Sequence, residues 1–175
     1  MKRNVILLMA APLLALALGA CTVTLRSPVT VAAVSTNVTL RFGVQVSDII
    51  TNFEPTRGAS TAYYVGDPVQ FRLDSRQRGY VTLVIWNPDG RLDSGSQLAN
   101  IPVDVGTNYI PRSVNLSAAP PTGRSYVRAY FTSAPSSYSW SGSVTLDAWN
   151  ARGTIFYHDV PQTARDIAQT SLYVR

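Results

Sequence analysis

The chain has 175 residues and a formal net charge of +5, with 15 Lys and Arg residues against 10 Asp and Glu residues. This length allows one domain with a sizeable hydrophobic core. A single cysteine excludes a disulfide within one chain, and one cysteine with one histidine cannot supply an ordinary zinc site. Because the arginines are spread along the chain, the sequence does not predict the basic stripe of a nucleic-acid-binding protein.

The first 20 residues have the layout of a secretory signal. Lys2 and Arg3 precede an uncharged apolar run from Val5 to Ala20, which is shorter than the ~20 residues of a membrane-spanning helix. The run ends in Leu18-Gly-Ala-Cys21, which resembles the lipobox of bacterial lipoproteins. The resemblance implies cleavage before Cys21 and lipid on its thiol, so the membrane is an expected partner. The alternatives are a plain cleaved signal and an uncleaved anchor.

The predicted mature chain begins at Cys21 and has a formal charge of +3, because it loses Lys2 and Arg3. Residues 21–37 are predicted to be a tether, although their alternating apolar residues could also form an extra strand. Thr22 stands where an aspartate often marks inner-membrane retention of lipoproteins. The resemblance therefore implies a lipid-anchored protein of the cell envelope, at the outer membrane.

Residues 38–175 are predicted to form one domain, in which apolar residues recur with a period of two. The segment Tyr80–Trp86 is almost continuously apolar and is typical of a central strand. The turn sequence Asn87–Gly90 follows it, with a partner strand expected at 91–94. The other predicted strands are 40–46, 69–73, 101–105, 107–110, 125–131 and 168–174, with a hinge at Gly106.

The C-terminal part is more ambiguous. Val144–Asn150 fits either a short helix or a strand, Thr154–Tyr157 favours an extended conformation, and Gln162–Ile167 permits a helical turn. Short strands separated by Gly and Pro turns at this spacing predict an all-β protein. The expected fold is an antiparallel, immunoglobulin-like β-sandwich with little helix.

The order of several weak motifs resembles a known family. Gly66–Phe71, Gly79–Leu83 and Pro88–Gly90 are followed by Ile101–Gly106 and Val127–Pro135. In this order they resemble the bacterial, envelope-associated domain-of-unknown-function family 4384, over roughly residues 50–135. The resemblance implies an immunoglobulin-like sandwich and supplies no catalytic residues.

Residues that could carry chemistry are few. His158, between Tyr157 and Asp159, could be a base or a metal ligand, or a hydrogen-bonded histidine at a strand end. No Gly-x-Ser-x-Gly motif occurs. Three aspartates near turns could form a loose calcium site or cap the turns: Asp89, Asp93 and Asp104. We therefore expect no cofactor, no metal and no enzymatic activity.

The segment Ser136–Ser143 resembles a contact surface in its composition, because Tyr, Trp, Ser and Gly together supply rigid amphipathic area and adaptable hydrogen bonds. The candidate contact residues are Tyr138, Trp140 and Trp149. Alternatively, Trp140 and Trp149 fold back and cover an open end of the sandwich.

Three functional hypotheses follow. The first is a structural or interaction subunit of an envelope or cell-surface assembly, held by lipid on Cys21 and bound to an envelope protein. The second is a binding module for cell-wall glycan or a small ligand. The third is a metal-dependent oxidative-defence enzyme acting around His158.

Overall fold

A computed structural model describes residues 38–92, 97–112, 116–140 and 142–175. The predicted signal peptide (1–20) and tether (21–37) lie outside these residues. The described elements are β1 (Val38–Arg41), β2 (Val44–Ser47), β3 (Ile50–Pro55), β4 (Ala62–Tyr63), β5 (Phe71–Ser75), β6 (Gly79–Trp86), β7 (Arg91–Leu92), β8 (Gln97–Val103), β9 (Gly106–Ile110), β10 (Gly123–Thr132), β11 (Gly142–Ser143), α1 (Leu146–Phe156), the short helix η2 (Gln162–Ala164) and β12 (Arg165–Val174).

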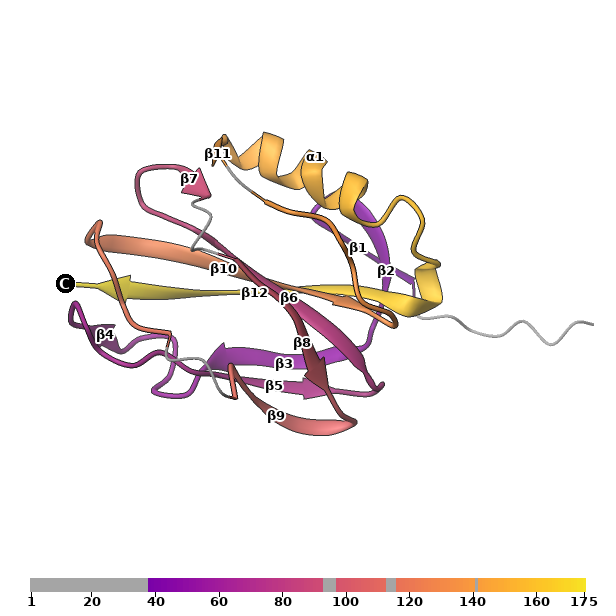
Figure 1. Cartoon of the computed structure of the whole chain (residues 1–175), viewed down its shortest axis with the longest axis horizontal. Helices are drawn as coiled ribbons and strands as arrows, with labels where there is room; N and C mark the ends of the chain where they lie inside the picture. Colours follow the sequence, from indigo (N-terminus) through magenta and orange to yellow (C-terminus); the bar gives the residue numbers. More distant parts are fainter. Residues whose placement is uncertain (1–37, 93–96, 113–115, 141) are drawn as a thin grey trace, which may run out of the picture. The chain divides into compact units, whose positions relative to one another are not determined.

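Two sheets form the sandwich. The larger has the strand order β4-β12-β10-β6-β8 and the smaller has the order β3-β5-β9. Figure 1 shows β3, β5 and β9 as a separate layer beside the larger sheet. All neighbours within the two sheets are antiparallel except β12 and β4. The all-β sandwich prediction is confirmed, and β6 is a central strand as predicted.

The first hydrophobic core lies between the two sheets. The predicted alternation is seen directly in β5, where Phe71 and Leu73 are fully buried and Arg72 is exposed. Apolar residues of β6 and β10 also belong to this core, and the end of β12 adds the alternating residues Leu172 and Val174. The strand-derived members are Ile50, Phe53, Tyr63, Phe71, Leu73, Val81, Leu83, Val103, Ile110, Val127, Ala129, Phe131, Leu172 and Val174.

A second core covers the other face of the larger sheet. Helix α1 and the β1–β2 hairpin lie over this face (Figure 1). Because of this extra layer, β10 is buried on both faces rather than on one. The buried members of the second core are Val44, Val46, Val84, Leu92, Tyr130, Trp140, Val144, Trp149, Phe156, Tyr157 and Ile167.

Helix α1 corrects the prediction of an extended segment at Thr154–Tyr157. The helix begins after Thr145, whose hydroxyl oxygen accepts a hydrogen bond from the Ala148 N–H at 3.2 Å. Trp149, Gly153 and Phe156 are buried, at the spacing of one helical face. Burial of that face stabilises a helix across residues whose β-branched and aromatic side chains favour strands.

The predicted strand 40–46 is in fact a tight hairpin. Phe42 has φ of 51° and Gly43 has φ of 79°, the pair of positive values that a two-residue type I′ turn requires. β1 and β2 pair through this turn, and Leu40 is 70% exposed. Alternation continues across the turn, so the period of two could not reveal it.

The turn Asn87–Gly90 is confirmed, because the Gly90 N–H donates to the Asn87 carbonyl at 2.9 Å and Gly90 has φ of 78°. The strand predicted at 91–94 is described only at β7, which pairs with β11 and not with β6. The hinge at Gly106 is also confirmed, and it carries the chain from one sheet to the other. The helical turn predicted at 162–167 is limited to η2, since β12 begins at Arg165.

Arg128 joins four elements of the second core. It is 1% exposed, and its guanidinium carbon lies 4.0 Å from the ring centre of Phe42 and 3.7 Å from that of Trp149. Its Nε donates to Gln169 Oε1 and its Nη2 donates to Asn150 Oδ1, both at 2.8 Å. Strands β10 and β12, helix α1 and the hairpin turn are therefore connected by one side chain.

Asp166 connects the hairpin to the sandwich from the buried start of β12. Its carboxylate accepts hydrogen bonds from the Ile49, Ile50 and Ile167 N–H groups at 2.7, 2.6 and 2.7 Å, and from Arg41 at 2.9 Å. Burial raises the pKa of this carboxyl, whereas the backbone donors and the Arg41 guanidinium lower it.

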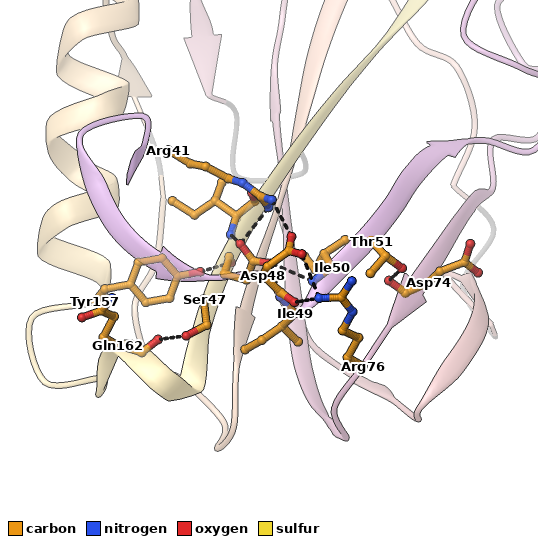
Figure 2. A network of polar contacts seen from close by, with 12 residues as sticks. Arg41, Ser47, Asp48, Ile49, Ile50, Thr51, Asp74, Arg76, Tyr157 and Gln162 are labelled. Carbon is orange, nitrogen blue, oxygen red and sulfur yellow. Dashed lines mark hydrogen bonds and ion pairs between the residues drawn. The ribbon is translucent and has the colours of Figure 1, made fainter. Parts of the chain in front are cut away.

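The network extends outward from Arg41 through ion pairs. Figure 2 shows Asp48 between Arg41 and Arg76. Asp48 accepts from Arg41 at 2.9 Å and from Arg76 at 2.8 Å. The corner between β2 and β3 is therefore held both by a buried carboxylate and by a solvated one.

Candidate functional site

A groove of about 640 Å³ opens between two segments next to the second core. One wall is the segment 132–139, which follows β10, and the other is the end of α1 with the loop 159–161. We refer to it as the loop groove. Representative lining residues are Pro135, Ser137, Tyr138, Ile155, Asp159 and Val160.

The first wall is held in place by two side-chain amides of β8. Asn100 Nδ2 donates to the Ser136 carbonyl at 2.8 Å, and the Ser136 N–H donates to Asn100 Oδ1 at 2.8 Å. Gln97 Nε2 donates to the Tyr138 carbonyl at 3.1 Å, and the Trp140 N–H donates to Gln97 Oε1 at 2.7 Å. The amides thus take the place of a neighbouring strand for this segment.

A bulge in β8 places Asn100 for this role. The register between β6 and β8 shifts between Val81 and Leu83, and Asn100 has φ of 54°. The Asn100 N–H donates to the hydroxyl of Thr82 on β6, opposite the bulge, at 3.4 Å. Asparagine tolerates the left-handed conformation better than most residues, and bulges reorient side chains in this way. Sequence patterns gave no signal for either Gln97 or Asn100.

The hydrogen bonds of the groove wall alternate as they do along an extended segment. Its bonds to β8 involve Ser136, Tyr138 and Trp140, which are alternate residues. The amide and carbonyl groups of successive residues point to opposite edges of an extended chain, so those of every second residue share one edge. Those of the exposed Ser137 and Ser139 therefore face away from β8, and they have no hydrogen-bond partner among the described residues.

The opposite wall presents apolar surface. Ile155 is 59% exposed, although it lies next to the buried Phe156. The half-buried ring of Tyr138 meets Phe156 edge-on at a centroid distance of 5.9 Å. Sequence analysis missed Ile155, because it assigned this region to an extended segment rather than to the end of a helix.

The structure corrects two of the three predicted contact residues. Trp140 and Trp149 are 1% and 0% exposed, and Trp140 packs 4.8 Å from the ring centre of Tyr130. Large aromatic side chains gain most free energy by leaving water, and α1 provides the cover here. The tryptophans therefore lie on a face of the larger sheet rather than at an open end of the sandwich. Only Tyr138 reaches the loop groove.

Asp159 is the only charged residue among the described residues that line the groove. Its Oδ1 lies 2.8 Å from Nδ1 of His158, and the two side chains are 94% and 82% exposed. His158 follows the end of α1 and not the end of a strand. The groove therefore has an acidic rim, and its remaining lining is neutral.

The other residues proposed for chemistry are dispersed. Asp89 accepts a hydrogen bond from the Arg91 N–H at 3.2 Å, as in turn capping. Asp104 forms ion pairs with Arg78 at 3.1 Å and with Arg112 at 3.5 Å. Asp93 lies outside the described residues. Within the described part of the chain, no three His, Cys, Asp or Glu residues are grouped closely enough to hold a metal ion.

No helix in the described ranges is long and apolar enough to span a bilayer. The chain matched nothing in comparisons with protein-family models, with curated proteins and with solved structures. The lipobox and the resemblance to family 4384 stay predictions from short motifs.

Proposed function

We propose that this protein is a lipid-anchored subunit of a cell-envelope assembly that binds an envelope partner through the loop groove. The lipobox-like sequence ending at Cys21 supports the anchor, and Thr22 after the cysteine supports the outer-membrane location. The groove supports the interaction role, because it combines exposed apolar surface with walls that are held by specific hydrogen bonds.

The observation that carries the proposal is the exposure of Ile155 within this groove. A single exposed isoleucine is ordinary on a protein surface. Here it stands opposite Pro135 and Tyr138, so that a bound chain would be enclosed by apolar groups on two sides. Such concave surfaces with a few polar groups are typical of binding sites.

A glycan-binding function is the second candidate. It is favoured by the serines at 133, 136, 137 and 139, which line the groove together with Tyr138. A catalytic role for His158 has less support, because the His158–Asp159 pair is solvated.

The groove can be tested by co-purification of partners from crosslinked envelopes with the full-length protein. Ile155→Asp places a charge on the apolar wall and should reduce recovery of the partner at least about tenfold, by analogy with central interface residues. Since Ile155 is already exposed, the change should leave the melting temperature nearly unaltered.

Leu146→Asp is the matched control. Leu146 is 47% exposed at the other end of the same helix, and it does not line the groove. This variant should recover the partner as the wild type does. Equal recovery with both variants would refute the groove as the contact site.

A further inference from the structure

We infer, on the basis of the proposed function, that the partner enters the loop groove as an extended peptide strand that carries a basic side chain. The groove wall at Ser137 and Ser139 has the exposed main-chain groups that an added strand requires. A strand bound there would make main-chain hydrogen bonds on one edge, in the manner of β-strand addition.

The alternation of hydrogen bonds along the wall supports strand addition. Asn100 and Gln97 bind the edge of the segment that faces β8, at residues 136, 138 and 140. The opposite edge is left with two residues whose amide and carbonyl groups are unpaired among the described residues. Because the β8 amides hold residues 136, 138 and 140, the edge at Ser137 and Ser139 is positioned before a ligand binds, which reduces the entropic cost of binding.

The lining also defines the side chains that fit. Successive side chains of a bound strand point to opposite faces, so one set can pack on Ile155 and Val160. The other set lies near the rim, where Asp159 is the only charged group among the described lining residues. A lysine or arginine at that position gains an ion pair, whereas a glutamate is repelled.

The probe for this inference is a labelled peptide of about six residues, the length of an ordinary strand, in which valine and lysine alternate. Its binding to the full-length protein in detergent is measured by fluorescence anisotropy and compared with that of the valine–glutamate counterpart. We expect the lysine peptide to bind about fivefold more tightly, and Asp159→Asn should abolish this preference.

Main-chain pairing is tested by Ser137→Pro against Ser137→Ala. Proline fits an extended segment but removes the N–H group that faces the groove, so it should weaken binding about fivefold. Alanine retains the N–H group and should bind the peptide as the wild type does. Every second N–H group of the peptide lies on the same edge. N-methylation of the set of residues that faces the groove wall should weaken binding, whereas N-methylation of the other set should not, which tests the pairing without any change to the protein.

Three results would overturn the inference. The first is that the Ser137→Pro variant binds the peptide as tightly as the wild type does, and the second is that N-methylation weakens binding equally on either edge of the peptide. The third is that the protein binds peptidoglycan fragments but not the peptide, and that Ser137→Ala weakens binding of the fragments. The last result would identify a glycan ligand and leave the groove as the binding site. Failure of the Ile155→Asp co-purification test, by contrast, would refute the proposed function whatever the peptide does.

Discussion

Arg128 is a buried cation that pairs with no carboxylate among the described residues. The faces of Phe42 and Trp149 enclose its guanidinium, and the amide oxygens of Gln169 and Asn150 accept two of its hydrogen bonds. Stacking on aromatic faces and neutral acceptors together offset part of the desolvation cost. Desolvation still lowers the pKa of Arg128. Burial of its charge therefore reduces the free energy that the second core contributes to stability.

Tyr130, beside Arg128, makes the stability of the fold sensitive to alkaline pH. Burial raises the pKa of Tyr130 to about 12, although the nearby Arg128 charge opposes this effect. Between pH 10 and pH 12 the unfolded chain releases the tyrosine proton while the folded chain keeps it. The unfolded state then binds fewer protons, so the free energy of unfolding falls as the pH rises, by about 2 kcal/mol at pH 12 for this group.

The Tyr130→Phe variant should lose this part of the pH dependence. Urea unfolding at pH 8, where neither state ionises at this position, should give a free energy within about 1 kcal/mol of the wild type. From pH 8 to pH 11, the free energy of unfolding of the variant should rise by about 1 kcal/mol relative to that of the wild type. Parallel profiles for the two proteins from pH 8 to pH 11 would contradict the assignment.

At the scale of elements, Asp166 determines how the hairpin and the sandwich are joined. Its two oxygens accept four hydrogen bonds from groups on three segments: the β1 side chain of Arg41, the corner at 49–50, and β12 itself. Asp166→Asn replaces one oxygen with an NH₂ group that faces donors. We expect destabilisation by about 3–5 kcal/mol, the usual cost of breaking a buried ionic network.

The control for this prediction is Asp48→Asn, the same substitution in the same network. Asp48 is about one-third exposed and binds Arg41 and Arg76 at the surface (Figure 2). Solvated ion pairs contribute little, so the cost should stay below about 1 kcal/mol. Chemical unfolding of the two variants measures both values, and similar losses would show that Asp166 has no special role.

At the scale of the whole molecule, the decisive feature of the proposed function is the anchor. If Cys21 is lipidated, the mature protein begins at that residue and partitions into detergent, and Cys21→Ala is released or mislocalised. Each buried methylene contributes about 0.8 kcal/mol, so two or more acyl chains give stable attachment. Intact-mass spectrometry of the mature protein measures this, and an unmodified cysteine would refute the anchor.

The tether would determine where the groove can act. Seventeen residues lie between positions 21 and 37, and a chain of this length spans at most about 60 Å when fully extended. The start of β1 can therefore lie no farther than this from the membrane to which the lipid is attached. The proposed partner is expected within reach of a domain held at that distance.

Much of the sandwich could be predicted from the sequence because strand periodicity is a local property. Residues such as Phe71, Leu73, Val81 and Leu83 alternate or cluster as strands do, and they lie in the core as expected. The turn at Asn87–Gly90 was equally local, since proline and glycine restrict or permit particular backbone angles. The predicted contact segment Ser136–Ser143 overlaps the segment 132–139 that lines the loop groove.

Tertiary packing decided the rest. Whether Ile155 and Phe156 lie in a helix, and whether Trp140 is exposed, depend on the layer that covers the second face of the larger sheet, which no local pattern records. The loop groove depends on Asn100 and Gln97, which meet a segment about 40 residues away through a bulge. Contacts between distant segments are formed only when the sheets assemble, so their free energy is absent from any short window of sequence.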